Sequence, residues 1–220
     1  MKPPPAVICI GRNYAAHAAE MGGACPDRPT VFMKNPAAVA ADGDDVVIPP
    51  ICHEHGPQVD FEGELAVIVG RACRDAAPDD ALTFVSGYAA ANDLSARWWQ
   101  KNGSGGQWIR GKSFDGFCPM SPTVSAEGIP DPQALRIVTR LNGEVMQDAP
   151  TSDMIFSVRH LISELSRGTT LLAGTVLLTG TPPGVGAART PPRFLQDGDL
   201  IDVEIASVGR VRNRIVDAPS

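Results

Sequence analysis

The sequence predicts a mainly β fold with short helices, an α+β arrangement, and three observations support this prediction. The 220 residues include 22 glycines and 20 prolines, a turn-rich composition that favours many short strands joined by tight connections. Apolar runs of strand length recur along the chain, whereas only residues 153–167 have a long helical period. No internal repeat or linker divides the sequence. We therefore expect residues 1–220 to form a single domain.

The first half contains strand-length segments that are apolar or β-branched and end at glycine, proline or charged residues. These expected strands cover residues 6–10, 30–34, 46–48, 59–69 and 82–91. A short helix from Tyr14 to Met21 should separate the first two strands, capped by Asn13 and ended at Gly22. The strand over residues 82–91 runs into Asn92 and Asp93 and then into a helix. Such a connection typically presents a carboxylate at a pocket mouth.

The second half predicts two hairpins, one helix and one buried strand. Residues 135–141 alternate in polarity, and Asn142-Gly143 is typical of a type I′ turn leading into residues 144–147. Residues 153–167 predict the longest helix, which should end at Gly168. The remaining expected elements are a strand over residues 175–179 that enters a Gly/Pro loop and a hairpin over residues 200–215.

Charge and hydropathy narrow the class of protein. The net charge of −6 and the lack of a basic stripe argue against nucleic acid as a partner. No segment has the ~18 apolar residues of a membrane span, and the N-terminal segment lacks the features of a signal peptide. The cysteines are odd in number, scattered and without a CxxC pair, which suits reduced thiols in a cytoplasmic protein. They are Cys9, Cys25, Cys52, Cys73 and Cys118.

Two glutamates at the start of one strand suggest a metal site. Residues i and i+2 of a strand face the same way, so Glu62 and Glu64 should project side by side. Two like charges that close repel each other unless a cation lies between them, and a divalent metal ion is a common solution. The alternative is a solvated strand edge with Gly63 as a bulge.

Other charged residues leave more than one interpretation open. His17 and Glu20 share a face of the expected helix, either as a general base with its orienting carboxylate or as a surface ion pair. The segment Cys52-His53-Glu54-His55 could bind zinc, although flanking prolines and a glycine indicate a loop at a pocket rim. The glycine-rich residues 101–106 could be a lid or a surface loop. Arg110 and Lys112 alternate like strand neighbours and would supply local cations for an anionic substrate.

Five motifs together resemble the fumarylacetoacetate hydrolase family, and the resemblance runs from about Val7 to Ile215. In chain order they are Asn13-Tyr14-x-x-His17-x-x-Glu20, Asp60-Phe61-Glu62-Gly63-Glu64-Leu65, Asn92-Asp93-x-Ser95-Ala96-Arg97, Lys112-Ser113-Phe114-Asp115 and Leu178-Thr179-Gly180-Thr181-Pro182-x-Gly184-Val185-Gly186. The resemblance implies the mixed β-sandwich roll of this family and a homodimer. It also implies that Glu62, Glu64 and Asp93 bind Mg²⁺ or Mn²⁺, as three carboxylates would.

The resemblance also implies a reaction and roles for individual residues. We expect a hydrolase that cleaves a C–C bond in an acylpyruvate or related small anionic 2-oxo acid. His17, assisted by Glu20, would activate water, and Lys112 would neutralise the developing enolate charge. Thr181 and Gly180 would hold the substrate carboxylate, with Arg12 and Gln100 as further substrate contacts.

Three other functions remain open at this stage. The same metal centre could serve a decarboxylase or an isomerase or tautomerase, and a metabolite-binding protein without turnover is a more remote alternative. Two positions depart from the family pattern. Trp98 stands where an acidic residue is common, which puts the support of Arg97 and the shape of the pocket in doubt. Asn35 stands where proline is common.

Overall fold

The computed structural model describes residues 2–218, which form two curled sheets with short helices around them. The larger sheet has the strand order β2-β1-β13-β6-β7-β9-β3, with β10 paired to β7. Its strands are β1 (Val7–Gly11), β2 (Thr30–Lys34), β3 (Val39–Ala41), β6 (Gly63–Val69), β7 (Val85–Asn92), β9 (Cys118–Met120), β10 (Val124–Ser125) and β13 (Val176–Leu178). The sheet mixes parallel and antiparallel pairs: β1 runs parallel to β13, whereas β6 is antiparallel to both neighbours.

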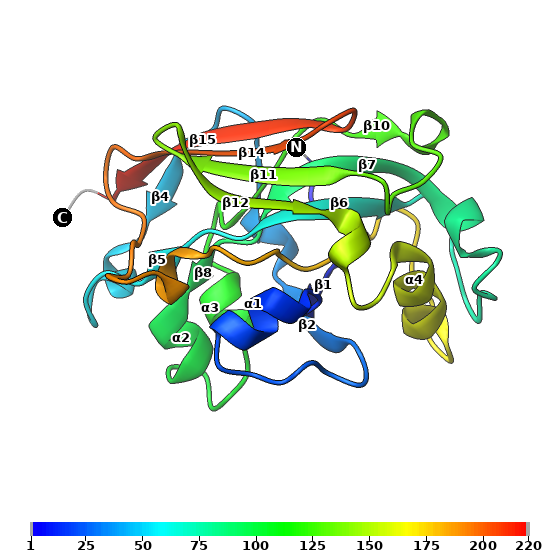
Figure 1. The fold of residues 1–220 in the computed structure, drawn as a ribbon, viewed down its shortest axis with the longest axis horizontal. Coiled ribbons are helices and arrows are strands. Elements are labelled where there is room, and N and C mark those ends of the chain that lie inside the picture. The colour runs from blue at the N-terminus through cyan, green and yellow to red at the C-terminus, as the bar shows by residue number, and fades with distance from the viewer. Residues whose placement is uncertain (1, 219–220) are drawn as a thin grey trace.

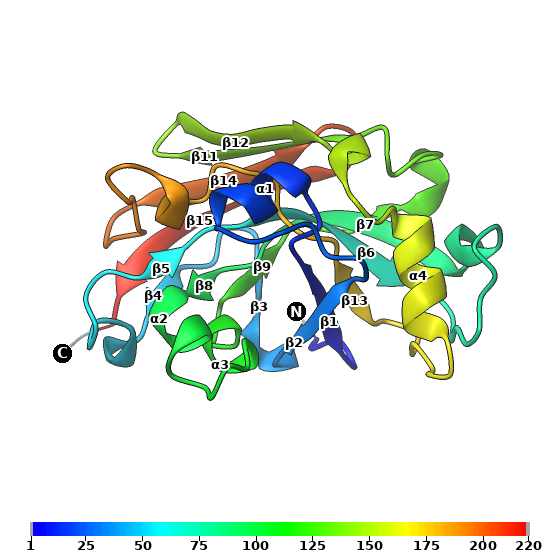
Figure 2. The same ribbon diagram turned by 60° about the horizontal axis from the view of Figure 1, so that its bottom comes forward.

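The second sheet covers one face of the first. Its strand order is β12-β11-β14-β15-β4, and a separate pair joins β5 to β8. The strands of these two sheets are β4 (Val46–Ile48), β5 (Val59–Asp60), β8 (Ser95–Ala96), β11 (Arg136–Leu141), β12 (Glu144–Pro150), β14 (Leu200–Ile205) and β15 (Gly209–Asp217). Figure 1 shows β11, β12, β14 and β15 in the upper part of the molecule, and in the turned view of Figure 2 β6 and β7 lie below them.

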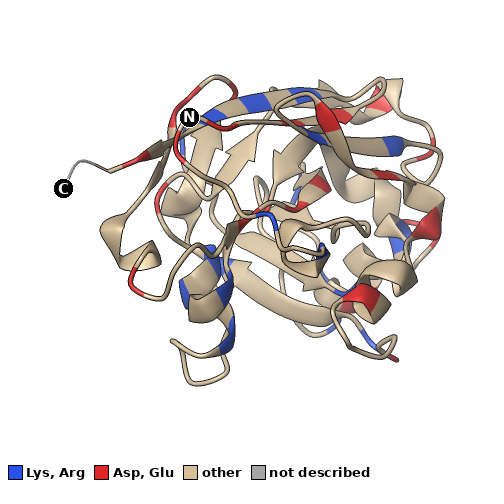
Figure 3. Ribbon diagram, turned by 60° about the vertical axis from the view of Figure 1, so that its left-hand side comes forward, with Lys and Arg blue, Asp and Glu red and all other residues tan. Residues whose placement is uncertain are grey.

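Four short α-helices complete the fold, namely α1 (Ala15–Glu20), α2 (Arg97–Lys101), α3 (Ile109–Lys112) and α4 (Val158–Ser166). Figure 2 shows α2 and α3 next to each other at the lower left, α1 above them, and α4 at the right of the molecule. Within residues 2–218 no helix combines the length and apolar character needed to cross a membrane. Figure 3 shows acidic and basic residues interspersed over many elements; on β15, for example, Arg214 pairs with Asp45 at 2.7 Å.

The alternation of side chains along β6 directs them into two different apolar clusters. Leu65 and Val67 face the second sheet and join the main core between the layers. Ala66 points the opposite way, into a cluster of small residues that includes Ala89 and Ala91 of β7. Because the side-chain period of a strand is two residues, Glu64 lies on the same side as Ala66. The carboxylate end of β6 is therefore directed away from the interlayer core and toward α1, α2 and α3.

Most of the elements expected from the sequence are confirmed. The strands expected over residues 6–10, 30–34 and 46–48 appear within one residue of those bounds. The type I′ hairpin is confirmed by φ values of 53° at Asn142 and 86° at Gly143. The mainly β fold class is likewise confirmed by the two curled sheets.

Three local predictions and one alternative are wrong. Asn13 does not cap α1, because its side chain bonds the backbone of Phe156 and Thr179 instead. The long helix begins at Val158, after an N-cap at Ser157, rather than at residue 153. Arg110 and Lys112 lie on α3 and not on a strand. Gly63 is paired in register with Asn92, and the irregularity of β6 lies at Ile68/Val69, so Gly63 forms no bulge.

Candidate active site

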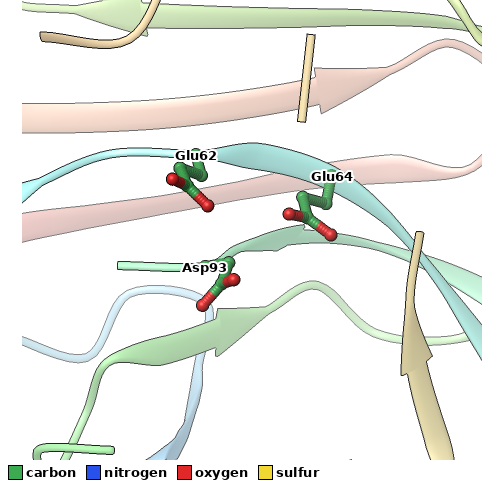
Figure 4. Close-up of side chains that lie close together, drawn as sticks. All are labelled: Glu62, Glu64 and Asp93. Carbon is green, nitrogen blue, oxygen red and sulfur yellow. The ribbon is translucent and has the colours of Figure 1, made fainter. Parts of the chain in front are cut away.

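Three carboxylates meet where β6 and β7 lie side by side. Each of Glu62, Glu64 and Asp93 offers an oxygen atom, and these atoms all lie within 4.8 Å of one another. Figure 4 shows the side chains of Glu62 and Glu64 side by side along β6, with Asp93 close to both. The pairing of Gly63 with Asn92 and a 2.8 Å hydrogen bond from the Asp93 N–H to the Glu62 carbonyl bring Asp93 to this place. The local pattern and the strand register together build the cluster.

The cluster is buried, which excludes the solvated strand edge as an interpretation. Glu62 is 6% exposed, Glu64 1% and Asp93 0%. Buried carboxylates need compensating positive charge or hydrogen bonds. The prediction that Glu62 and Glu64 lie side by side at a strand end is confirmed.

Three basic side chains contact two of the three carboxylates. Lys112 Nζ lies 2.6 Å from Glu62 Oε2 and 2.7 Å from Asp93 Oδ2. Lys34 Nζ lies 2.5 Å from Asp93 Oδ1, and Arg97 Nη1 lies 2.6 Å from Glu62 Oε1. Glu64 has no basic partner among residues 2–218, and its Oε2 accepts a 2.7 Å hydrogen bond from the Gly180 N–H.

This unequal pairing shifts the pKa values of the two glutamates in opposite directions. Burial by itself would raise the pKa of Glu62, but the attraction of Lys112 and Arg97 outweighs it and lowers that pKa. Burial raises the pKa of Glu64 well above its usual value, and repulsion from Asp93 and Glu62 adds to the increase. For Lys112, burial opposes the charged form, but Asp93 and Glu62 raise its pKa, so it stays protonated.

The donor set fits a hard divalent cation. Three carboxylate oxygens converge in one buried place, and Mg²⁺ and Mn²⁺ both prefer such ligands. Glu64 is the carboxylate that lacks a basic partner, so a cation there would relieve the repulsion that raises its pKa. The residues present therefore fit the metal site that the sequence predicts.

His17 and Glu20 form a hydrogen-bonded pair on α1, and His17 faces a cavity that Glu62 and Glu64 also line. The His17 Nδ1 atom lies 2.8 Å from Glu20 Oε1. The two oxygens of Glu20 also accept from the Gly184 N–H at 3.1 and 2.9 Å, which ties the pair to the Gly/Pro loop. His17 is only 6% exposed, so this is not the alternative surface ion pair. A carboxylate only accepts hydrogen bonds, so the Nδ1–H donates to Glu20 and the Nε2 atom is the one available for proton transfer.

A cavity of about 130 Å³ connects these groups. Its lining includes both glutamates of the cluster, His17, Lys112 and three of the predicted substrate contacts, which are Arg12, Gln100 and Thr181. Gly180 lies next to Thr181. The structure thus brings together the predicted residues, although their roles stay predictions.

Two of the predicted substrate donors are already used within the protein. The Gly180 N–H donates to Glu64, and the Thr181 hydroxyl donates to the Gly63 carbonyl at 3.0 Å. Gln100 uses its Oε1 atom to accept from Arg97 Nη1 at 3.1 Å, which leaves its amide nitrogen without a partner among the described residues. Gln100 is therefore a better placed donor to a ligand than Gly180 or Thr181.

Trp98 does not block the cavity. Its ring stacks on His55 with a centroid distance of 3.5 Å, and it is not part of the cavity lining, whereas Trp108 is. His53 pairs with Asp217 at 3.0 Å, and neither His53 nor His55 lines the cavity. Within the described residues, the side chains that could hold a metal ion are Glu62, Glu64 and Asp93, so a zinc site at His53 and His55 finds no support.

Sequence reasoning did not assign Asp60 or Lys34 to the site. Asp60 accepts from Arg97 at 2.9 and 2.7 Å and from the Gly186 N–H at 2.7 Å, and so supports Arg97 in place of an acidic residue at position 98. Asp60 lies two residues before Glu62, and this spacing is the feature of the sequence that could have indicated its place in the site. Lys34 was a lone cation at the end of an apolar strand, but no local pattern connects it to Asp93.

Comparison with known proteins agrees with the family resemblance seen in the sequence. Residues 6–216 match the family model described as "Fumarylacetoacetate (FAA) hydrolase C-terminal". The oxaloacetate tautomerase YisK of Bacillus subtilis (strain 168) is 45% identical over 218 residues, covering 97% of this chain and 70% of YisK. The fumarylacetoacetate hydrolase of Exiguobacterium antarcticum has a TM-score of 0.88 at 42% identity, covering 98% of this chain and 76% of that one.

A further solved structure contains a metal ion. It is the fumarylpyruvate hydrolase of Pseudomonas aeruginosa in complex with Mn²⁺ and pyruvate, with a TM-score of 0.86 at 30% identity, covering 98% of this chain and 91% of that one. The match to the family model spans nearly all of the chain. The chain is therefore an enzyme of the fumarylacetoacetate hydrolase family.

Proposed function

We propose that this enzyme catalyses the keto–enol tautomerisation of a small 2-oxo acid of the oxaloacetate type, with Mg²⁺ or Mn²⁺ held by Glu62, Glu64 and Asp93. The observation that carries the proposal is His17, oriented by Glu20 at 2.8 Å, in the same cavity as the two glutamates. A divalent cation would supply Lewis-acid stabilisation of negative charge on the substrate oxygen.

The side chains of the chain itself supply the proton transfer. His17 Nε2 removes a proton from carbon 3 of the keto acid and delivers it to the oxygen of the enolate, and the reverse reaction uses the same steps. Glu20 holds the imidazole in the required tautomer and stabilises its protonated form. Lys112 stays charged between Glu62 and Asp93 and offsets their negative charge during the reaction.

The relatives support a tautomerase before a hydrolase. YisK, named an oxaloacetate tautomerase, is 45% identical to this chain, against 42% for the fumarylacetoacetate hydrolase of Exiguobacterium antarcticum and 30% for the fumarylpyruvate hydrolase. Keto–enol exchange needs one acid–base group beside the enolate oxygen, and His17 meets that requirement. From the sequence we expect a hydrolase first, with a tautomerase as an alternative. The relatives place the tautomerase before the hydrolase.

Acylpyruvate hydrolysis is the second candidate. The same His17–Glu20 pair could take a proton from a water molecule that attacks the distal carbonyl, after which the C–C bond breaks. Decarboxylation would not need His17 as a base.

Assembly as a homodimer and a cytoplasmic location remain further proposals.

The decay of enol-oxaloacetate absorbance, measured with Mn²⁺ and then with EDTA, tests the proposal. We expect acceleration that EDTA removes, and a His17→Ala variant that loses activity about 100-fold or more. His53→Ala is the matched control, because His53 is half exposed and lies outside the cavity. Equal loss in both variants, or turnover unaffected by EDTA, would contradict the proposal.

A parallel assay with an acylpyruvate separates the two candidates. Faster release of pyruvate than tautomerisation of oxaloacetate would place hydrolysis first. Absence of both activities with either metal would support the metabolite-binding alternative instead.

A further inference from the structure

One buried carboxylate close to the site has no part in the proton transfer described above. Asp60 ends β5, is 0% exposed and does not line the cavity, so it is not placed to touch a ligand there. A buried charge is costly unless it is paired and hydrogen-bonded. Its two oxygens accept five hydrogen bonds, which come from Arg97 Nε and Nη2 and from the N–H groups of Phe61, Gly186 and Ala187.

We propose that Asp60 is a positioning residue that joins the metal-binding half of the site to the acid–base half. On one side it fixes Arg97, which contacts Glu62. On the other side it fixes the loop over residues 184–187, which contacts Glu20. This inference rests on the proposed function, because it assumes the tasks given there to the two halves.

Through Arg97, Asp60 determines how Glu62 is held. Arg97 directs Nε and Nη2 to Asp60 Oδ2 at 2.9 and 2.7 Å, and Nη1 lies 2.6 Å from Glu62 Oε1. A guanidinium whose fork is free can take both oxygens of a carboxylate, and it would then compete with a metal ion for Glu62. Because Asp60 occupies the fork, Arg97 orients Glu62 through one nitrogen only. Such outer partners of metal ligands tune metal affinity.

Through the loop over residues 184–187, Asp60 also determines where Glu20 lies. The N–H groups of Gly186 and Ala187 donate to Asp60 at 2.7 and 3.0 Å. Two residues earlier, the Gly184 N–H donates to the two oxygens of Glu20 at 3.1 and 2.9 Å. Three backbone donors within four residues therefore connect the two carboxylates.

The loop has no room to shift independently of these partners. Gly184 has a φ of 107°, and a Cβ atom there would clash with the Met146 carbonyl oxygen. A Cβ atom at Gly186 would lie 2.7 Å from Asp60 Oδ1. The backbone is thus packed directly against Asp60 at one end and against β12 at the other. A change at Asp60 should therefore reach Glu20 and, through it, the His17 imidazole.

Two measurements that need no turnover test this inference. One is the affinity for Mn²⁺ by calorimetry. The other is the NMR signal of the His17 Nδ1–H proton in EDTA, which is assigned by its absence in His17→Ala and which depends on the hydrogen bond to Glu20. The variants are Asp60→Asn, which keeps the size of the side chain, and Asp60→Glu, which keeps its charge.

Asp202→Asn is the matched control. Asp202 is also a buried carboxylate, 4% exposed, and it is paired with Arg210 and Arg212 outside the cavity. Its loss should lower stability and leave both measurements unchanged. A purely structural role of Asp60 would make Asp60→Asn behave in the same way.

We expect Asp60→Asn to bind Mn²⁺ about 10–100-fold more weakly and to lose the His17 Nδ1–H signal through faster exchange with water. The physical reason is that an amide has one acceptor oxygen, and its NH₂ group would face a donor. Asp60→Glu should lose less of both properties. In an Arg97→Gln background, Asp60→Asn should weaken Mn²⁺ binding no further, because Asp60 acts on Glu62 through Arg97.

A wild-type value of either measurement in Asp60→Asn would overturn the inference, since the two halves would then not be joined through this residue. A further loss of Mn²⁺ affinity in the Arg97→Gln background would overturn it as well. Both effects in a protein that does not tautomerise oxaloacetate would support the role of Asp60 and contradict the proposed function, so the two failures are distinguishable.

Discussion

Glu62 and Glu64 are neighbours on one face of the chain, yet their surroundings give them opposite electrostatic properties. Glu62 contacts Lys112 and Arg97, whereas Glu64 contacts only a backbone N–H among the described residues. The pKa of the first is lowered and that of the second is raised. The two residues should therefore differ in their effect on the stability of the metal-free protein.

In EDTA at pH 7, Glu62→Gln should lower the free energy of unfolding by about 3 kcal/mol, as loss of a buried ion pair does. A carboxyl group with a lowered folded pKa stabilises the fold above its unfolded pKa, and this contribution is lost as pH falls through the folded value. Glu64 has a raised pKa, so its charged form opposes folding as pH rises, and Glu64→Gln should be neutral or stabilising. Urea unfolding curves measure the free energy of unfolding of both variants. A larger loss of this free energy in Glu64→Gln than in Glu62→Gln would contradict this account.

With a metal ion bound, all three carboxylates of the cluster should contribute to stability. With Mn²⁺ at about 100 times its Kd, the wild type should gain about 2.7 kcal/mol of stability, seen as a rise in Tm. Glu62→Gln, Glu64→Gln and Asp93→Asn should each reduce the rise, because each removes a carboxylate oxygen from the cluster. Glu144→Gln, at an exposed hairpin position, is the control and should respond like the wild type. A full rise in the Asp93→Asn variant would remove Asp93 from the metal site.

The elements that surround the site are short, and their mutual packing holds the functional side chains in place. Lys112 is the last residue of α3, a helix of four residues that packs against α2. Gly111 lies at the contact, where a Cβ atom would lie 2.4 Å from the Gln100 nitrogen and 2.8 Å from the Ala96 carbonyl oxygen. These are backbone atoms, so they cannot move aside without shifting α2.

Gly111→Ala should therefore move α3 away from α2 and displace Lys112 from Glu62 and Asp93. We expect a loss of about 1–3 kcal/mol in unfolding free energy together with reduced turnover. Gly128→Ala is the control, because Gly128 has no atom within 4 Å of its added Cβ and lies in a short exposed turn. Unfolding curves for both variants check this, and equal stability of the two would contradict the packing account.

Across the whole molecule, the two sheets bury four of the five cysteines and leave Cys25 exposed. Burial raises the pKa of Cys118 and of Cys52 to about 12, so both remain thiols at neutral pH. Titration of the native protein with a thiol reagent at pH 8 should show one fast-reacting group, and five after unfolding. Cys25→Ser should remove the fast phase, whereas two or more fast thiols in the native protein would contradict the burial pattern.

Features that depend on short spacings could be predicted from the sequence. Alternation along a strand places Glu62 and Glu64 together, and Asn142-Gly143 specifies a type I′ turn, because both effects arise within a few residues. The bounds of α4 are harder to predict: polar Ser157 caps the helix, which begins at Val158, and residues 151–153 form a separate turn.

Contacts between distant segments were decided by the tertiary structure. Strand register brings Asp93 beside Glu62, and burial forces Lys34, 59 residues away, to pair with Asp93. Asp60 holds the Arg97 side chain, a role for which the sequence has no acidic residue at position 98. Trp108 lines the cavity, whereas Trp98 does not. Local periodicity specifies which side chains share a face. Only the packing of the sheets and helices determines which faces meet, because one pattern of apolar and charged residues is compatible with many pairings.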